Sequence, residues 1–256
     1  MNAFSINQNL TFTSRAPQIR DAQWVCQKVR SFPHVSTTHF APHVEELADK
    51  NMILYDRFTN KKPFEHFFVH SPEELKLIKI FTWHKRLVDR ITKARDEWRI
   101  ASSDDYRRVG NILNQFKYEG LGNCGEDAYL AAAILKLNGV DNACIAKMKI
   151  DKYWIDHVIC VFNRDGSAFD GKSLKNAIIV DPWVGDADFA QNMFLKYKGI
   201  YKKFMCDIKP ESKIKLCRSD YVLFSQKELK VLQEKYKYLL YPENKRGFMQ
   251  KNNPNA

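Results

Sequence analysis

Three residues of this chain have the types and the order that nucleophilic chemistry requires, and the first is a cysteine. Cys124 follows the turn Gly120–Asn123 and opens a run of strong helix formers that ends at Asn138–Gly139, a pair suited to a helix C-cap. The cysteine is therefore expected at a helix N-terminus. There, unpaired N–H groups and the positive end of the helix dipole favour an anion, and the thiolate is the form of cysteine that attacks carbon.

The other two residues are a histidine and an aspartate on predicted strands. Asn142–Ile150 alternates like a strand, His157 lies at the start of the β-branched run Asp156–Phe162, and Asp181 ends an apolar run that a proline halts. If the last two strands pair antiparallel, the start of one lies beside the end of the other. His157 and Asp181 would then be neighbours, as a base and its orienting carboxylate must be.

Two acidic residues beside the cysteine bear on this prediction. Glu126 and Asp127 fall in the first helical turn, where they suit the helix dipole but oppose a nearby thiolate. We expect His157 to outweigh them, most simply as an imidazolium paired with the sulfur.

Together, the segments Gly122–Ala128, Asp156–Val161 and Val180–Trp183 resemble the core of the transglutaminase-like superfamily, which belongs to the papain-like group of thiol enzymes. The resemblance covers Gln115–Trp183. It implies an α+β fold in which the nucleophile helix packs on an antiparallel sheet. It also implies a Cys-His-Asp catalytic triad of Cys124, His157 and Asp181.

The same resemblance implies a site for the oxyanion of the reaction. Papain-like enzymes use a polar side chain upstream of the nucleophile, for which Gln115 and Tyr118 are both candidates. The backbone N–H groups of the nucleophile and Gly125 would add to it, with Asn123 alongside. Trp183 either forms a wall of the cleft or packs beneath it.

The predicted function is thiol-dependent acyl transfer on amide bonds of a protein substrate. Glutamine deamidation, proteolysis and amine cross-linking use the same triad, and the sequence leaves the choice open. One alternative is a non-catalytic binding module of the same fold that docks an acidic partner. A minor one is an arylamine N-acetyltransferase-like enzyme, whose usual arginine before the cysteine is absent from Glu119–Asn123.

The sequence gives no support for a metal or another cofactor. His34, His39 and His43 lie close together, but Pro42 and the irregular spacing argue against a helical pair of ligands. The six cysteines form no C-x-x-C pair and no close Cys/His cluster. We therefore expect free thiols and a reducing compartment.

Composition limits the partners and the location. The formal charge of +11 can attract nucleic acid, anionic lipid or an acidic protein partner. The lysines are spread along the chain without a nucleic-acid motif, which is typical of an ordinary solvated surface, with a charged docking face as the alternative. No signal peptide and no membrane-spanning run is visible, so we expect a soluble protein. Residues 1–20 are similar in composition to the leaders of bacterial effectors, and secretion into a host-cell cytoplasm is a hypothesis that rests on that similarity and on the family resemblance.

Turn and helix signals divide the chain into four parts. A cap at Ser71-Pro72 opens a long helical pattern that runs to about Ile100 and forms the centre of an amino-terminal helical lobe. The predicted parts are a flexible amino terminus (1–20), the helical lobe (21–110), the transglutaminase-like catalytic core (111–240) and a tail (241–256).

Overall fold

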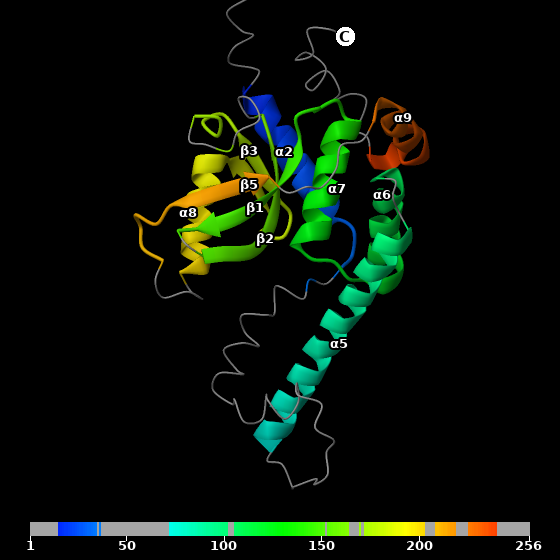
Figure 1. Ribbon diagram of the computed structural model, residues 1–256, viewed down its shortest axis with the longest axis vertical. Helices are drawn as coiled ribbons and strands as arrows, with labels where there is room; N and C mark the ends of the chain where they lie inside the picture. The colour runs from blue at the N-terminus through cyan, green and yellow to red at the C-terminus, as the bar shows by residue number, and fades with distance from the viewer. Residues whose placement is uncertain are drawn as a thin grey trace, which may run out of the picture.

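A five-stranded antiparallel sheet organises the chain (Figure 1). The computed structural model describes residues 15–34, 36, 72–101, 105–151, 153–163, 169, 172–202, 208–218 and 225–239. The strands lie side by side in the order β4-β3-β2-β1-β5, and every neighbouring pair is antiparallel. They are β1 (Cys144–Ile150), β2 (Tyr153–Phe162), β3 (Ile178–Asp181), β4 (Asp186–Phe189) and β5 (Ile214–Arg218). With the helices around them, they confirm the predicted α+β class.

Both faces of the sheet are covered by helices. On one face, Cys160 and Phe162 of β2 pack into a core with α7 (Cys124–Leu137) and α2 (Arg15–Arg30). On the other, Ile159 and Val161 pack against α8 (Ala190–Tyr201). Successive strand residues point to opposite faces, which is why the central segments Val158–Phe162 of β2 and Ile178–Val180 of β3, covered on both faces, are apolar at every position.

Helix α7 is the centre of the larger core. Every residue of α7 except Gly125 is buried, because α2, α6 (Asp105–Asn114) and α9 (Gln226–Lys235) contact the sides that the sheet leaves open. The helix ends at Leu137 with Asn138 as its C-cap, and Gly139 has φ of +87°, so the predicted C-cap is confirmed. Its first residue, Cys124, is therefore held by a rigid and fully packed element.

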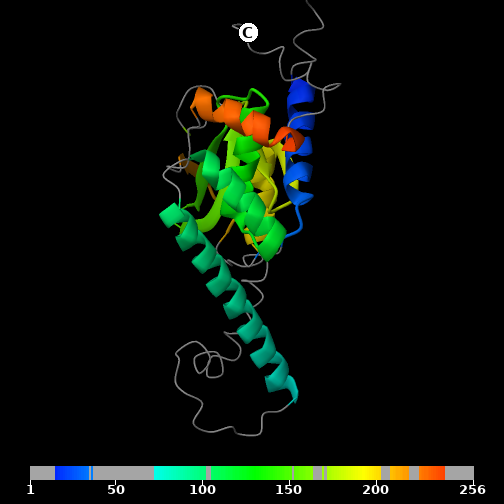
Figure 2. The ribbon, with the colours of Figure 1, turned by 90° about the vertical axis from the view of Figure 1, so that its right-hand side faces the viewer.

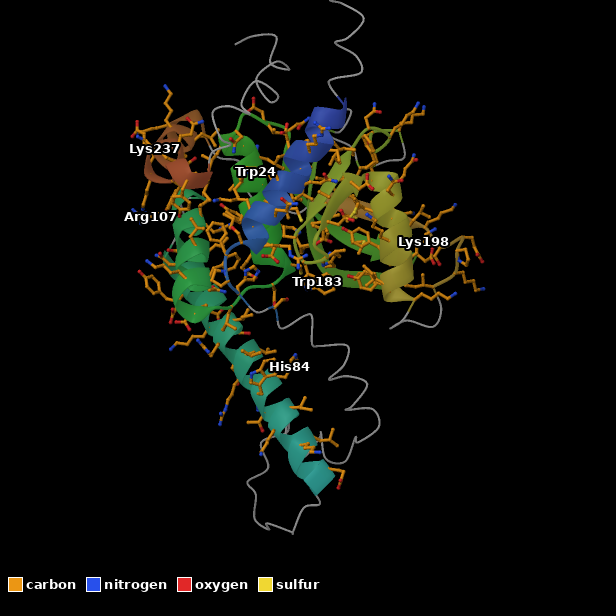
Figure 3. All side chains as sticks on the ribbon, turned by 180° about the vertical axis from the view of Figure 1, so that it is seen from behind. Trp24, His84, Arg107, Trp183, Lys198 and Lys237 are labelled. Atoms are coloured by element: carbon orange, nitrogen blue, oxygen red, sulfur yellow. The ribbon has the colours of Figure 1, made fainter. Side chains whose placement is uncertain are left out.

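Helix α2 differs from the prediction. It begins at Arg15, inside the segment expected to be flexible, and it packs into the same core as α7 although the sequence placed it in a separate lobe. Ala22, Val25 and Val29 recur at helical spacing and give the helix one buried face. Figure 3 shows α2 lying across α7 and the sheet.

Helix α5 (Pro72–Ala101) begins where the cap signal predicts and extends away from the sheet (Figures 1 and 2). Near its carboxyl-terminal half, Leu87 and Ile91 form a small cluster with Leu121, in the turn that precedes the nucleophile helix. The described chain ends with the short helix η2 (Lys237–Leu239). The predicted tail and much of the predicted lobe, residues 37–71, lie outside the described residues.

Two predictions from composition can be compared with the structure. The five cysteines among the described residues, at positions 26, 124, 144, 160 and 217, are all free thiols. No helix in the described part of the chain is long and apolar enough to cross a bilayer.

Candidate active site

The turn that leads into Cys124 is held by two glycines and a π-helical turn, η1 (Gln115–Glu119). Gly120 has φ of +62°, a left-handed conformation that favours glycine. At Gly122, a Cβ atom would collide with the rings of Phe116 and His34. The two aromatic rings therefore pack directly on the backbone that positions the cysteine, and only glycine permits this.

Gln115 braces the same turn. Its side chain is buried, and Nε2 donates a hydrogen bond to the Leu121 carbonyl over 3.0 Å. Its backbone carbonyl accepts from the Gly120 N–H. Among the described residues, no group hydrogen-bonds to its Oε1. The structure thus assigns Gln115 to the turn, and its role in binding an oxyanion stays a prediction.

Cys124 is the first residue of α7, as predicted, and is 5% exposed. The first backbone hydrogen bond of the helix runs from the Asp127 N–H to the Asn123 carbonyl. The N–H of Gly125 precedes that bond and lies next to the sulfur-bearing residue. An N–H in this position can stabilise negative charge on a nearby atom.

Asn123 caps the helix. Its backbone N–H donates to Glu126 Oε2 over 2.8 Å, and its side-chain oxygen accepts from Ser36 Oγ over 3.1 Å. The Glu126 carboxylate, which was expected to oppose the thiolate, therefore accepts a hydrogen bond from the capping residue. Because these contacts are structural, the structure favours a capping role for Asn123 over the predicted role in the oxyanion site or cleft.

His157 lies at an irregular point of the sheet. Strand β2 begins at Tyr153 and not at Asp156, so the histidine is inside the strand. Lys147 pairs with Val158 but Met148 pairs with Ile155, which leaves two extra residues, Asp156 and His157, on β2. A bulge of this kind bends the strand and redirects its side chains, and bulges are frequent beside active sites.

The structure brings the three predicted residues together. His157 Nε2 lies 2.6 Å from Asp181 Oδ2, and both side chains are almost fully buried. His157 also forms a hydrogen bond with Cys124, and since Nε2 faces the carboxylate, Nδ1 is the nitrogen left for the sulfur. The predicted contact between the two strands is confirmed, and the sulfur, imidazole and carboxylate form one chain.

The charge of His157 follows from these contacts. Burial alone would lower the pKa of the imidazole, but the charge and hydrogen bond of Asp181, with a smaller contribution from Cys124, raise that pKa to about 10. The histidine is therefore an imidazolium near neutral pH. That state stabilises a thiolate beside it and places a proton where an amine could later collect it.

Asp181 is itself held by further donors. The Tyr197 hydroxyl donates to Asp181 Oδ2 over 2.7 Å, and the Val184 N–H donates to Oδ1 over 3.2 Å. Tyr197 comes from α8 and is fully buried, and its hydroxyl pKa is raised well above the ordinary value by burial and by the aspartate. Sequence analysis missed this residue, because nothing in the local pattern of α8 distinguishes it from a core aromatic.

Two aromatic candidates have different surroundings. Trp183 is half-buried and its ring centroid lies 4.8 Å from that of His157, so it shields the imidazole. Of the two roles left open for Trp183, this contact favours a wall of the site. Tyr118 is 71% exposed, with the Lys117 ammonium over its ring, which disfavours it as the oxyanion side chain.

The second acidic residue of the first turn has a partner that sequence analysis did not identify. Asp127 is buried, and its Oδ1 lies 2.9 Å from Nε2 of His34. His34 was weighed as a metal ligand with His39 and His43, both of which lie outside the described residues. Within the part of the chain that the structure covers, no group of His, Cys, Asp and Glu residues could hold a metal ion.

Comparison with known proteins assigns this chain to no family. A scan of protein-family models, a search of curated proteins and a search of solved structures each returned no match for this chain. Its function must therefore be inferred from the site itself.

We expect Tyr197→Phe to weaken the site without removing any catalytic atom. The variant loses a buried hydrogen bond to a carboxylate, which contributes about 1.5–3 kcal/mol to the free energy of unfolding. Because Asp181 then holds His157 less firmly, we expect alkylation of Cys124 at pH 7 to slow by about threefold to tenfold. Tyr118→Phe removes a hydroxyl from an exposed ring and is the matched control. Equal alkylation rates in Tyr197→Phe and the control would contradict the positioning role.

The raised pKa of His157 makes a prediction about stability and pH. The folded-state pKa, about 10, lies above the ordinary value of 6.5, so the stabilisation is complete below about pH 6.5 and is lost as the pH rises toward 10. Urea unfolding of the wild type and His157→Gln should differ by a few kcal/mol at pH 6. That difference should shrink steadily up to pH 10. A difference independent of pH would mean that His157 is not charged in the folded protein.

Proposed function

We propose that this protein is a cysteine-dependent enzyme that transfers acyl groups from amide bonds, with Cys124 as nucleophile, His157 as base and acid, and Asp181 as the carboxylate that orients the imidazole. The observation that carries the proposal is the buried contact of His157 with Asp181 on one side and Cys124 on the other. Each residue comes from a different element: Cys124 from α7, His157 from β2 and Asp181 from β3.

The reaction begins with the Cys124 thiolate and the His157 imidazolium. The sulfur attacks the amide carbonyl carbon, a C–S bond forms, and the carbonyl electrons move to oxygen. When the oxyanion collapses, the C–N bond breaks and the departing amine takes the proton of His157. A thioester and a neutral imidazole remain. His157 then removes a proton from water or an amine, which attacks the thioester and releases the sulfur as thiolate.

The environment of the sulfur supports this sequence of steps. The Gly125 N–H and the positive end of the α7 dipole are available to the oxyanion, and the half-buried Trp183 limits access of water to the imidazole. Asp181 accepts the hydrogen bond of Nε2–H, which leaves Nδ1 directed to the reacting atoms.

A papain-like or transglutaminase-like core is the finer fold that we propose. A nucleophile at the start of a buried helix, packed on an antiparallel sheet whose neighbouring strands carry the histidine and the aspartate, matches the expectation from the three sequence segments. On that basis the substrate is an amide of a protein. Deamidation, proteolysis and transfer to an amine all remain compatible with the site.

One observation favours the alternative of a non-catalytic binding module. Cys124 and His157 are 5% and 2% exposed, so the described residues leave little of either to solvent. A module that docks an acidic partner through its basic surface would need no access to the sulfur. The two proposals differ in one property, which is whether a carbonyl carbon can reach Cys124 and react there.

Acylation by p-nitrophenyl acetate tests the proposed function without knowledge of the substrate. We expect a rapid release of nitrophenolate equal to the protein present, with an acetyl group found by mass spectrometry on Cys124 and removed by hydroxylamine. Cys124→Ala and His157→Gln should lose the rapid phase. Slow acetylation spread over several cysteines, or a rapid phase that survives in Cys124→Ala, would overturn the proposal in favour of a binding module.

A further inference from the structure

We propose that His34 is a positioning residue for the thiol chemistry, and that it acts by forming a buried ion pair with Asp127 in the first turn of the nucleophile helix. The inference rests on the proposed function, since it concerns the reactivity of Cys124. It also makes the chain that follows α2 a part of the active site, although this segment is far from Cys124 in the sequence.

The surroundings of His34 define its protonation. Nδ1 lies 2.7 Å from the Phe32 carbonyl, and Nε2 lies 2.9 Å from Asp127 Oδ1. The Phe32 carbonyl only accepts hydrogen bonds, so Nδ1 carries a proton. The contact of Nε2 with Asp127 Oδ1 has the distance of an ion pair, and no group among the described residues hydrogen-bonds to this oxygen. Burial opposes the charged form, but Asp127 and the Phe32 carbonyl outweigh it, and the pKa of His34 is raised. The raised pKa favours the imidazolium form of His34, which at 2.9 Å compensates a negative charge on Asp127.

The ring of His34 also packs on the turn before the nucleophile. It stacks on Phe116 with the ring centroids 4.0 Å apart and the planes 8° from parallel. Its Cδ2 atom lies where a side chain at Gly122 would be. One residue thus fixes the backbone on the amino-terminal side of Cys124 and, through Asp127, the helix on the other side.

The charges around Asp127 explain why it needs a cation. Cys124 and Asp127 are three residues apart in a helix and so lie on the same face. Glu126 and Asp181 add negative charge nearby, and His157 is already committed to the sulfur and Asp181. Burial raises the pKa of Asp127, so its ionised form is costly without a partner. His34 is the cation that faces Asp127 from outside the helix.

A pair of this kind has a distinctive response to substitution. Removing one partner of a buried ion pair leaves a charge with no compensation, whereas replacing both by neutral groups is often tolerated. If His34 acts through Asp127, neutralising Asp127 must therefore restore what the loss of His34 removes. If His34 acts only by stacking on Phe116 and Gly122, neutralising Asp127 restores nothing.

The test compares iodoacetamide alkylation of Cys124 at pH 7 in four full-length proteins: wild type, Asp127→Asn, His34→Gln and the double variant. Asp127→Asn keeps the shape and a hydrogen-bond acceptor, and His34 can lose its proton once the carboxylate is gone, so this variant is the reference for the double variant. His34→Gln should be slower than the wild type by about tenfold or more. The double variant should return to within about threefold of Asp127→Asn.

Each outcome decides the proposal. A His34→Gln rate within threefold of the wild type, or a double variant as slow as His34→Gln, overturns it. If His34→Gln does not fold, a folded and reactive double variant supports the ion pair, and an unfolded or unreactive one overturns it. Failure of the proposed function would be seen separately, because wild-type Cys124 would then react no faster than the other cysteines.

Discussion

The buried hydrogen bond between His157 and Asp181 is the interaction on which the candidate site depends. A charged imidazole has no stable place inside a core unless a carboxylate compensates it, and the distance of 2.6 Å between Nε2 and Oδ2 provides that compensation. The same contact leaves Nδ1 for Cys124. It also keeps the imidazole protonated, and this is the proton that the reaction later transfers to the departing amine. The hydrogen bond from Tyr197 holds Asp181 in place, and the bulge in β2 directs His157 toward it.

Charge balance around the nucleophile helix is the second constraint. Cys124, Glu126 and Asp127 bring acidic groups into one helical turn, which by itself would oppose a thiolate. The structure answers each of them with a different partner. His157 contacts the sulfur, the Asn123 N–H binds Glu126, and His34 pairs with Asp127. Two of the three acidic groups therefore face an imidazole and the third accepts a backbone hydrogen bond, so each has a compensating partner.

The sequence predicted the features that depend on local signals. The bounds of α7 follow from the glycine turn, the run of helix formers and the Asn138 cap. The antiparallel pairing of β2 with β3 follows from two apolar runs in succession. The features that it missed, His34, Tyr197 and the burial of α2, depend on how distant segments dock. In the sequence, His34 looks like an ordinary loop histidine, Tyr197 like a core aromatic and α2 like any amphipathic helix. Only the packed structure gives the two residues their charged partners and gives the helix its place in the core.

The central claim is that His157 activates Cys124, and alkylation by iodoacetamide measures it most directly. Mass spectrometry would follow each of the six cysteines in the wild type and in His157→Ala at neutral pH. We expect wild-type Cys124 to react at least about tenfold faster than any other cysteine, including the fully buried Cys160, and to lose that advantage in the variant. A Cys124 that reacts no faster than the others, or equally fast without His157, would contradict the account.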